Sequence, residues 1–235
     1  MTTTPIVALD VSTADAADRI VSTLGSLCRF YKIGSELFTA AGPSSVARVR
    51  DAGCDVFLDL KLHDIPNTVA RAVTGAARLG ARLVTVHATG GEAMLRAAVE
   101  AAGDQAQCGI LAVTILTSLT GPEVASTWGR AANLDVSGEV LRLARIARSA
   151  EAFGVVASGH EAGRIRDTFG DSLAVLVPGV RPAGAVVHDQ ARVVTPAEAA
   201  RAGARFVVIG RAVTAAPDPR RAMDRILEEL AATVA

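Results

Sequence analysis

Aromatic residues are scarce in this chain: they make up only 3% of its 235 residues, although half of the residues are hydrophobic. A core must therefore be built mainly from Ala, Val, Leu and Ile, a composition that suits parallel strands covered by helices. Long apolar runs are also missing, since no stretch approaches the roughly 20 residues that cross a bilayer. The N-terminus lacks the basic region and apolar run of a secretory signal. These absences predict a cytoplasmic protein with no membrane partner.

A net charge is absent too, because 24 basic residues balance 24 acidic ones. The chain thus has no overall field to attract nucleic acid, and a nucleic-acid partner is disfavoured. Its three cysteines, Cys28, Cys54 and Cys108, are far apart and show neither a C-x-x-C motif nor the Cys/His spacing of a metal site. They are interpreted as small buried hydrophobic residues in a reducing compartment.

What the chain does have is an alternation of short β-branched runs with Ala/Arg/Glu-rich segments of helical period. The runs recur roughly every 20 to 30 residues and predict eight strands, each followed by one helix. The predicted strands cover residues 6–10, 30–34, 56–61, 83–87, 110–116, 155–158, 174–178 and 205–210. The predicted helices cover residues 14–24, 43–52, 68–79, 92–101, 136–152, 161–168, 196–202 and 219–231.

Eight such units can close into a barrel or lie open as a doubly wound sheet. The open sheet is disfavoured because residues 11–15, after the first strand, lack the G-x-G-x-x-G turn. The length is close to the roughly 250 residues of a typical eightfold barrel. We therefore predict the α/β class, with residues 1–235 forming a single (β/α)8 TIM barrel. Residues 117–135 and 179–195 exceed the length of a plain turn and are predicted to cover an active site.

Charged residues recur at the carboxyl ends of the first three predicted strands. Asp59 and Lys61 alternate with leucines, so the period of a strand sends both to the same side. Asp10 closes the first predicted strand and Lys32 lies near the end of the second, so all four charges should meet at one rim of the barrel. Such an array would prepare an electrostatic site before the substrate arrives. Each member also has a structural interpretation: an ion pair for Asp59 and Lys61, a helix cap for Asp10, a solvated strand end for Lys32.

A phosphate site is indicated at the end of the eighth strand. Barrels often bind phosphate with the loops after strands seven and eight, and Gly210 and Arg211 lie there. A glycine lets the backbone approach the ligand, and an arginine offers paired hydrogen bonds. A surface arginine at a turn is the alternative.

The stretch from Asp59 to Thr68 resembles the D-x-K-x-x-D-I-P-x-T signature of the orotidine 5'-monophosphate decarboxylases. The likeness extends along nearly the whole chain, without a clear departure at a catalytic position. Further segments occur in the family's order: Leu9-Asp10, Tyr31-Lys32-Ile33-Gly34, Val84-Thr85-Val86-His87, Val113-Thr114-Ile115-Leu116-Thr117-Ser118, Pro178-Gly179-Val180-Arg181-Pro182, Gln190-Ala191-Arg192 and Val208-Ile209-Gly210-Arg211.

This resemblance implies decarboxylation of orotidine 5'-monophosphate to uridine 5'-monophosphate (UMP), in pyrimidine biosynthesis, without cofactor or metal. Lys61 would be the proton donor, and Asp59, Asp64 and Lys32 would act with it. Asp64 and Thr68 would reach into the site of a partner subunit, which implies a homodimer with shared active sites. The resemblance further implies substrate contacts from the following residues: Asp10 and Lys32; Thr117 or Ser118 at the pyrimidine; Gln190 and Arg211 at the phosphate; and Arg181 and Gly210 beside them.

Two alternatives stay open at this point. A Mg²⁺-dependent sugar-phosphate decarboxylase or aldolase of the same barrel superfamily can share the D-x-K-x-x-D strand end. A non-catalytic sensor of a phosphate ligand is disfavoured, because such a protein would be expected to lose part of the Asp/Lys array. The histidines at 63 and 87 are not assigned a catalytic role, since lone histidines more often serve as structural hydrogen-bonding residues.

Overall fold

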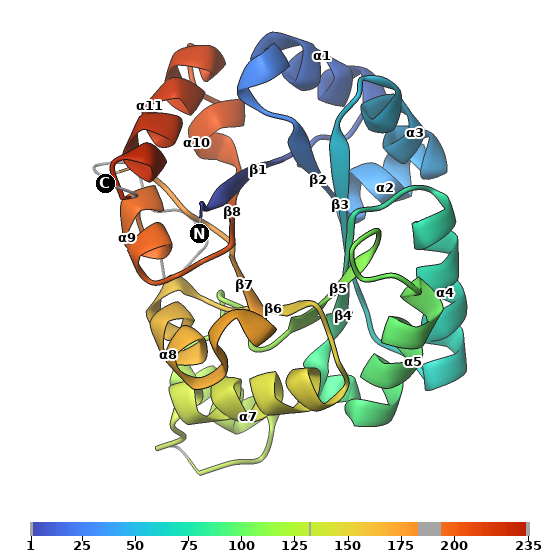
Figure 1. The fold of residues 1–235 in the computed structure, drawn as a ribbon, viewed down its shortest axis with the longest axis vertical. Coiled ribbons are helices and arrows are strands. Elements are labelled where there is room, and N and C mark those ends of the chain that lie inside the picture. Colours follow the sequence, from blue (N-terminus) through green and yellow to red (C-terminus); the bar gives the residue numbers. More distant parts are fainter. Residues whose placement is uncertain (1, 132, 183–193, 234–235) are drawn as a thin grey trace.

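The computed structural model describes residues 2–131, 133–182 and 194–233. Its eight strands are parallel, follow one another in chain order and close into a barrel through the pairing of the first with the last, as Figure 1 shows. The predicted (β/α)8 fold is therefore confirmed. The strands are β1 (Thr4–Ala8), β2 (Phe30–Gly34), β3 (Asp55–Leu62), β4 (Leu83–His87), β5 (Gly109–Val113), β6 (Gly154–Val156), β7 (Ala174–Val177) and β8 (Phe206–Ile209).

Helices surround the barrel on its outside (Figure 1). The first has the predicted bounds, and its N-cap Thr13 accepts a hydrogen bond from the Ala16 N–H group. Three short helices, α2, α6 and α10, were not predicted. The α-helices are α1 (Ala14–Leu24), α2 (Ser35–Ala41), α3 (Pro43–Asp51), α4 (Pro66–Arg78), α5 (Glu92–Ala102), α6 (Gly121–Thr127), α7 (Val136–Ser149), α8 (Gly159–Phe169), α9 (Pro196–Arg201), α10 (Arg211–Thr214) and α11 (Pro219–Ala231).

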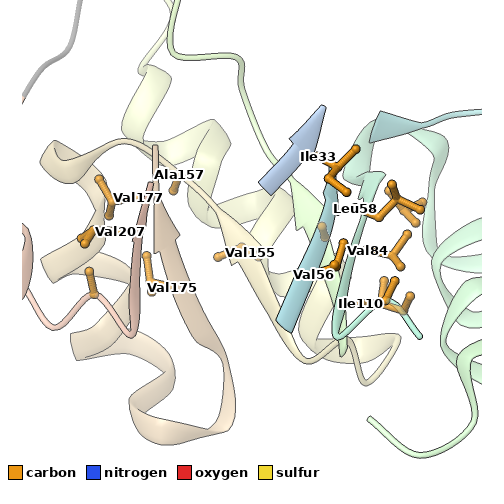
Figure 2. Packing of buried hydrophobic residues seen from close by; sticks show 14 of the residues in the cluster. Ile33, Val56, Leu58, Val84, Ile110, Val155, Ala157, Val175, Val177 and Val207 are labelled. Atoms are coloured by element: carbon orange, nitrogen blue, oxygen red, sulfur yellow. The ribbon is translucent and has the colours of Figure 1, made fainter. Parts of the chain in front are cut away.

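Each strand contributes to two separate apolar clusters. On β3, Val56 and Leu58 belong to the large cluster between strands and helices, whereas Phe57 between them belongs to a smaller cluster inside the barrel. Figure 2 shows the outward set on the strands, including Ile33, Val84 and Val207. Because successive side chains of a strand point to opposite faces, one short run of sequence builds both clusters.

Aromatic rings fill the amino-terminal end of the barrel interior. Phe206 packs edge-on against Phe30, with ring centroids 6.1 Å apart, and lies 6.2 Å from Phe153. The Arg205 guanidinium group lies over the Phe153 ring, at 4.9 Å from its centroid. Gly109 makes room for this packing, since a Cβ atom there would lie 2.8 Å from the Phe153 ring. Three of the eight aromatic residues of the chain thus close this end of the barrel.

Several strands end earlier than predicted at the opposite, carboxyl-terminal end. The first strand stops at Ala8 instead of residue 10, and the fifth at Val113 instead of residue 116. Backbone hydrogen bonds to the neighbouring strands nevertheless continue for one more residue, from the Leu9 N–H group to the Lys32 carbonyl oxygen at 2.9 Å and from the Thr114 N–H group to the Val156 carbonyl oxygen at 3.2 Å. Of the two long connections, residues 117–135 contain α6, and residues 183–193 of the second lie outside the described part of the chain. Within the described residues, no helix has the length and apolar character needed to span a bilayer.

Candidate active site

A cavity of about 630 Å³ opens at the carboxyl-terminal end of the barrel. This volume is in the range of small-molecule sites, and this end of a TIM barrel is where active sites lie. Apolar residues of the barrel interior, among them Phe57, Leu176 and Val208, form part of its wall. Most of the predicted site residues line it as well: Asp10, Lys32, Asp59, Lys61, Thr117, Ser118, Arg181, Gly210 and Arg211.

The four charges predicted from the strand ends form one continuous chain of contacts. Lys32 Nζ donates a hydrogen bond to Asp10 Oδ1 at 2.7 Å and lies 3.7 Å from Asp59 Oδ2. Lys61 Nζ lies 2.9 Å from each of the two Asp59 oxygens. Acid and base therefore alternate along the order Asp10, Lys32, Asp59, Lys61, and the array as a whole is electrically balanced.

The inner two members of this array are much more buried than the outer two. Their side chains are 12% exposed for Lys32 and 11% for Asp59, against 54% for Asp10 and 39% for Lys61. Burying a lone charge is costly, so the carboxylate of Asp59 depends on the two ammonium groups beside it. Lys61 is left at the open end of the array with access to the cavity. This ammonium group can therefore meet a ligand while its position is fixed from behind.

A glycine at the end of β2 makes the contact between Asp10 and Lys32 possible. A Cβ atom at Gly34 would lie 2.8 Å from Lys32 Nζ and 3.3 Å from Asp10 Oδ1. Both distances are shorter than ordinary van der Waals contacts. The absence of a side chain at Gly34 therefore leaves the space in which the ion pair sits.

The backbone of β3 is irregular where it carries the proton-donor candidate. Lys61 has a φ of 50°, which L-residues with long side chains rarely adopt. The pairing of β3 with β4 also shifts register between Leu58 and Leu62. The Lys61 N–H group donates to the Thr85 hydroxyl at 2.9 Å, and that hydroxyl donates to Asp59 Oδ1 at 2.9 Å. Sequence reasoning missed Thr85, although its inward position on β4, two residues after Leu83, was a usable signal.

The opposite side of the cavity carries the residues predicted to bind phosphate. Gly210 directly follows β8, and Arg211 begins α10 after it. A Cβ atom at Gly210 would meet no atom within 4 Å, so the backbone there faces open space. Arg181, in the segment after β7, also lines the cavity. This side therefore offers two guanidinium groups and an accessible backbone, which suits an anion.

Between the two sides, the segment after β5 contributes Thr117 and Ser118 to the lining. Their neighbours Ile115 and Leu116 line the cavity too, so this segment offers both apolar surface and hydroxyl groups. Glu36, in the first turn of α2, is a further lining residue that sequence reasoning missed. Its helix was not predicted, so no strand-end argument pointed to it.

Two predicted site residues, Asp64 and Thr68, do not line this cavity. The Asp64 side chain is exposed and accepts a hydrogen bond from the Ile65 N–H group at 2.6 Å, and Thr68 is exposed in the first turn of α4. Neither residue lines the cavity of its own chain. Gln190 lies outside the described residues. The roles predicted for Asp64, Thr68 and Gln190 stay predictions.

Two histidines lie beside the array without joining it. The rings of His63 and His87 have centroids 5.5 Å apart. Burial, together with His63 and Lys61, lowers the pKa of His87 below its usual value of 6.5. Among the described residues, no three His, Cys, Asp or Glu side chains gather in a way that could hold a metal ion.

Comparisons with known proteins agree on one family. Residues 3–226 match the model of the "Orotidine 5'-phosphate decarboxylase / HUMPS family". The orotidine 5'-phosphate decarboxylase of Cutibacterium acnes is 45% identical over 228 residues, which cover 97% of this chain and 96% of that protein. The enzyme of the same name from Moorella thermoacetica is 46% identical over 231 residues, covering 96% and 91%. The crystal structure of orotidine 5'-phosphate decarboxylase from Lactobacillus acidophilus superimposes with a TM-score of 0.85 at 35% identity, covering 98% and 99%.

Proposed function

Because this chain belongs to the orotidine 5'-phosphate decarboxylase / HUMPS family, we propose that it decarboxylates orotidine 5'-monophosphate to UMP and CO2 in pyrimidine biosynthesis. The observation that carries the proposal is the alternating chain of Asp10, Lys32, Asp59 and Lys61 at the cavity wall. The substrate is inferred from the name that the relatives share, and the alternating charges of the array suit its decarboxylation.

Loss of CO2 from C6 of the pyrimidine leaves an electron pair on carbon, with no obvious electron sink in the ring. A protein can lower that barrier by placing positive charge where the negative charge develops. Lys61 Nζ is held 2.9 Å from both oxygens of Asp59 and borders the cavity. In the proposed reaction this ammonium group stabilises the carbanion and then transfers a proton to C6.

Asp59 has a second effect on the bound substrate. Its carboxylate would lie beside the carboxylate that is lost, and the repulsion between them is relieved as CO2 departs. Such destabilisation of the ground state is a secondary contribution beside charge stabilisation by Lys61. Asp59 also fixes the Lys61 side chain, which limits the reorganisation needed at the moment of reaction.

The phosphate group would bind on the far side of the cavity, at Gly210, Arg211 and Arg181, with Gln190 completing the site. The pyrimidine then lies between Thr117 or Ser118 and the charged array. Binding energy from the phosphate can hold the long connections after β5 and β7 over the substrate. A substrate that lacks the phosphate is therefore expected to react poorly.

The proposal includes a homodimer in which each subunit completes the site of the other. Asp64 and Thr68 are exposed and do not line the cavity of their own chain, and Ile65 between them is 65% exposed. In the proposed dimer this isoleucine would be covered by the partner subunit, since the buried centre of an interface is mainly apolar. We place Asp64 and Thr68 at the partner's substrate across this contact.

Mixing two inactive variants tests the shared site. Lys61→Ala and Asp64→Ala homodimers should each lack activity, whereas their heterodimer contains one site with both native residues. Subunit exchange in an equal mixture is expected to restore about a quarter of the wild-type rate, because half of the dimers are mixed. A mixture that is shown by mass spectrometry to contain heterodimers and stays inactive would contradict the shared site.

The remaining parts of the proposal concern the setting of the enzyme. Residues 1–235 are proposed to form one decarboxylase domain that requires neither cofactor nor metal and binds no nucleic acid. A cytoplasmic location is supported by Cys28, Cys54 and Cys108, which are all buried and free.

The decisive measurement is the loss of orotidine 5'-monophosphate absorbance with purified protein in EDTA, for the wild type and for Lys61→Ala. The proposal requires rapid loss with the wild type and a rate at least about 10³-fold lower with the variant. No loss in EDTA, followed by turnover of a sugar phosphate once Mg²⁺ is added, would instead establish the magnesium-dependent alternative.

A further inference from the structure

One buried hydroxyl group contacts two members of the charged array, through the Asp59 carboxylate and the Lys61 backbone, without lining the cavity. Thr85 lies in the middle of β4 and is fully buried, with 0% of its surface exposed. It does not line the cavity, so it differs from the residues that can contact the substrate directly. Its neighbours on the same face of the strand are Leu83 and His87.

The hydroxyl group of Thr85 is used as both donor and acceptor. It donates to Asp59 Oδ1 at 2.9 Å and accepts from the Lys61 N–H group at 2.9 Å. These bonds join the side chain of one array member to the backbone of another. No aliphatic side chain of the same shape, such as valine, can supply either bond.

The need for this hydroxyl arises from the irregular end of β3. A regular parallel strand would direct the Lys61 N–H group to a carbonyl group of β4, but the register shift between Leu58 and Leu62 interrupts that ladder. Lys61 also has a φ of 50°, a conformation that costs free energy unless the surroundings hold it. The bond from its N–H group to Thr85 satisfies the displaced donor and holds this conformation.

The same hydroxyl also limits the freedom of the Asp59 carboxylate. Lys61 Nζ is shared equally between the two Asp59 oxygens, and Lys32 Nζ lies at 3.7 Å from one of them. The bond from Thr85 to Oδ1 adds a neutral, directional contact that fixes the rotation of the carboxylate. Because Lys61 Nζ is bonded to both carboxylate oxygens, the rotation of the carboxylate sets where the ammonium group points.

We propose that Thr85 is a positioning residue for decarboxylation: its hydroxyl couples the Lys61 backbone to the Asp59 carboxylate and so aims Lys61 Nζ into the cavity. The inference rests on the proposed function and extends it to a residue that meets no substrate. Misplacement of a reacting group by about 1 Å can reduce a rate about 100-fold. The effect of losing the hydroxyl should therefore fall on kcat, while substrate binding through the phosphate side is retained.

The test compares Thr85→Val, which keeps the shape and removes the hydroxyl, with Thr85→Ser, which keeps the hydroxyl. We expect kcat to fall about 10- to 100-fold in Thr85→Val with KM within about threefold of the wild type, and Thr85→Ser to keep kcat within about threefold. Rates are expressed per binding site, counted by calorimetric titration with UMP. The matched control is Thr114→Val, which removes another buried hydroxyl, one that donates to the Val156 carbonyl oxygen at 2.8 Å and does not touch the array.

The outcomes separate this inference from the proposed function. Wild-type protein without decarboxylase activity would overturn the function itself. An active wild type together with a Thr85→Val variant of unchanged kcat would overturn the role of Thr85 alone, as would equal losses in Thr85→Val and Thr85→Ser. If Thr85→Val does not fold, Thr85→Cys replaces it, since a thiol is a weak hydrogen-bonding group of nearly the size of serine. Equal kcat values for the Cys and Ser variants would then overturn the inference.

Discussion

The two ends of the barrel interior are built by the same strands and differ completely in chemistry. At the amino-terminal end β2 contributes Phe30, which packs against Phe206 with ring centroids 6.1 Å apart. Two residues later the same strand contributes Lys32, which contacts Asp10 and Asp59. The interior of the aromatic end is filled by apolar rings that need no charged partner inside the barrel, whereas every charged group at the other end depends on another. One end therefore stabilises the fold, and the other retains charges that a ligand in the cavity can meet.

Strand β3 repeats this contrast with a single residue type. Asp55 begins the strand, is 48% exposed and lies 3.5 Å from Arg50. Asp59, four residues later, is 11% exposed and contacts two ammonium groups and a hydroxyl group. An exposed ion pair contributes little to stability, whereas a buried one is sensitive to the loss of any partner. The position along the strand therefore decides what an aspartate does.

The largest effect is expected for Asp59→Asn. Removal of the negative charge leaves Lys32 and Lys61 without the group that holds them, so kcat/KM should fall about 10³-fold, or about 4 kcal/mol in activation free energy. Steady-state kinetics on orotidine 5'-monophosphate measures this change. Asp55→Asn at the other end of the same strand is the control and should keep the wild-type kcat/KM. Equal losses in the two variants would remove the functional contrast between the two ends.

The next effect concerns the aromatic end. Phe206→Ala removes the ring that contacts both Phe30 and Phe153, and should lower the free energy of unfolding by about 3 kcal/mol. The folded fraction should retain the wild-type kcat, because the cavity lies at the opposite end of the barrel. Urea denaturation and kinetics in the absence of denaturant measure the two quantities. A loss of kcat as large as that of stability would show that the two ends are coupled.

A smaller loss of activity is expected for Gly34→Ala. The added Cβ atom would lie 2.8 Å from Lys32 Nζ and must displace it from Asp10, so kcat/KM should fall about tenfold, or about 1.4 kcal/mol. Gly75→Ala on an exposed position of α4 is the control, because a Cβ atom there meets nothing within 4 Å. That control should keep its activity and gain up to about 1 kcal/mol of stability. Unchanged kinetics of Gly34→Ala would mean that the Asp10–Lys32 contact does not contribute to turnover.

The smallest effect concerns His87. Its folded-state pKa lies below the ordinary 6.5 of the unfolded chain, so the unfolded state takes up the proton first as the pH falls. Titration of His87 therefore leaves the free energy of unfolding unchanged above pH 6.5 and lowers it below pH 6.5. The loss grows until the pH falls below the folded-state pKa. His87→Gln should reduce the loss of stability between pH 7 and pH 5, as measured by urea denaturation across that range. His160→Gln is the control, since it removes an exposed histidine of α8 and leaves the His63–His87 contact intact. If the free energy of unfolding of His87→Gln fell more steeply than that of the wild type over this range, folding would raise the pKa of His87 instead of lowering it.

Sequence patterns predicted most of the fold because strands and helices here carry regular apolar periods. The bounds of β2 and β4 and of α1 and α11 agree with the prediction. The short helices α2 and α10 were missed because each begins directly at a strand end, within segments that lack an apolar period of their own. Prediction was therefore weakest at the carboxyl ends of the strands, where the chain leaves the barrel to form the site.

The candidate site follows the same division. Nine of the predicted site residues line the cavity, since strand-end charges and the family's motif both point to this rim. Glu36 and Thr85 were missed: the first lies on an unpredicted helix, and the second is a buried residue whose contacts cross from one strand to another. The inward position of Thr85 was visible in the sequence, but its bonds to residues 24 and 26 positions away were not.

The amino-acid sequence by itself determined the alternation of strands and helices, the inward and outward faces of each strand, and the residue types that meet at the barrel rim. It could do so because each of these properties depends on neighbours a few positions apart. Only the tertiary structure decided that Lys61 adopts a φ of 50°, that Thr85 holds it, and that Gly34 leaves room for Lys32. Those features depend on distances between strands, which closure of the barrel fixes and local sequence does not encode.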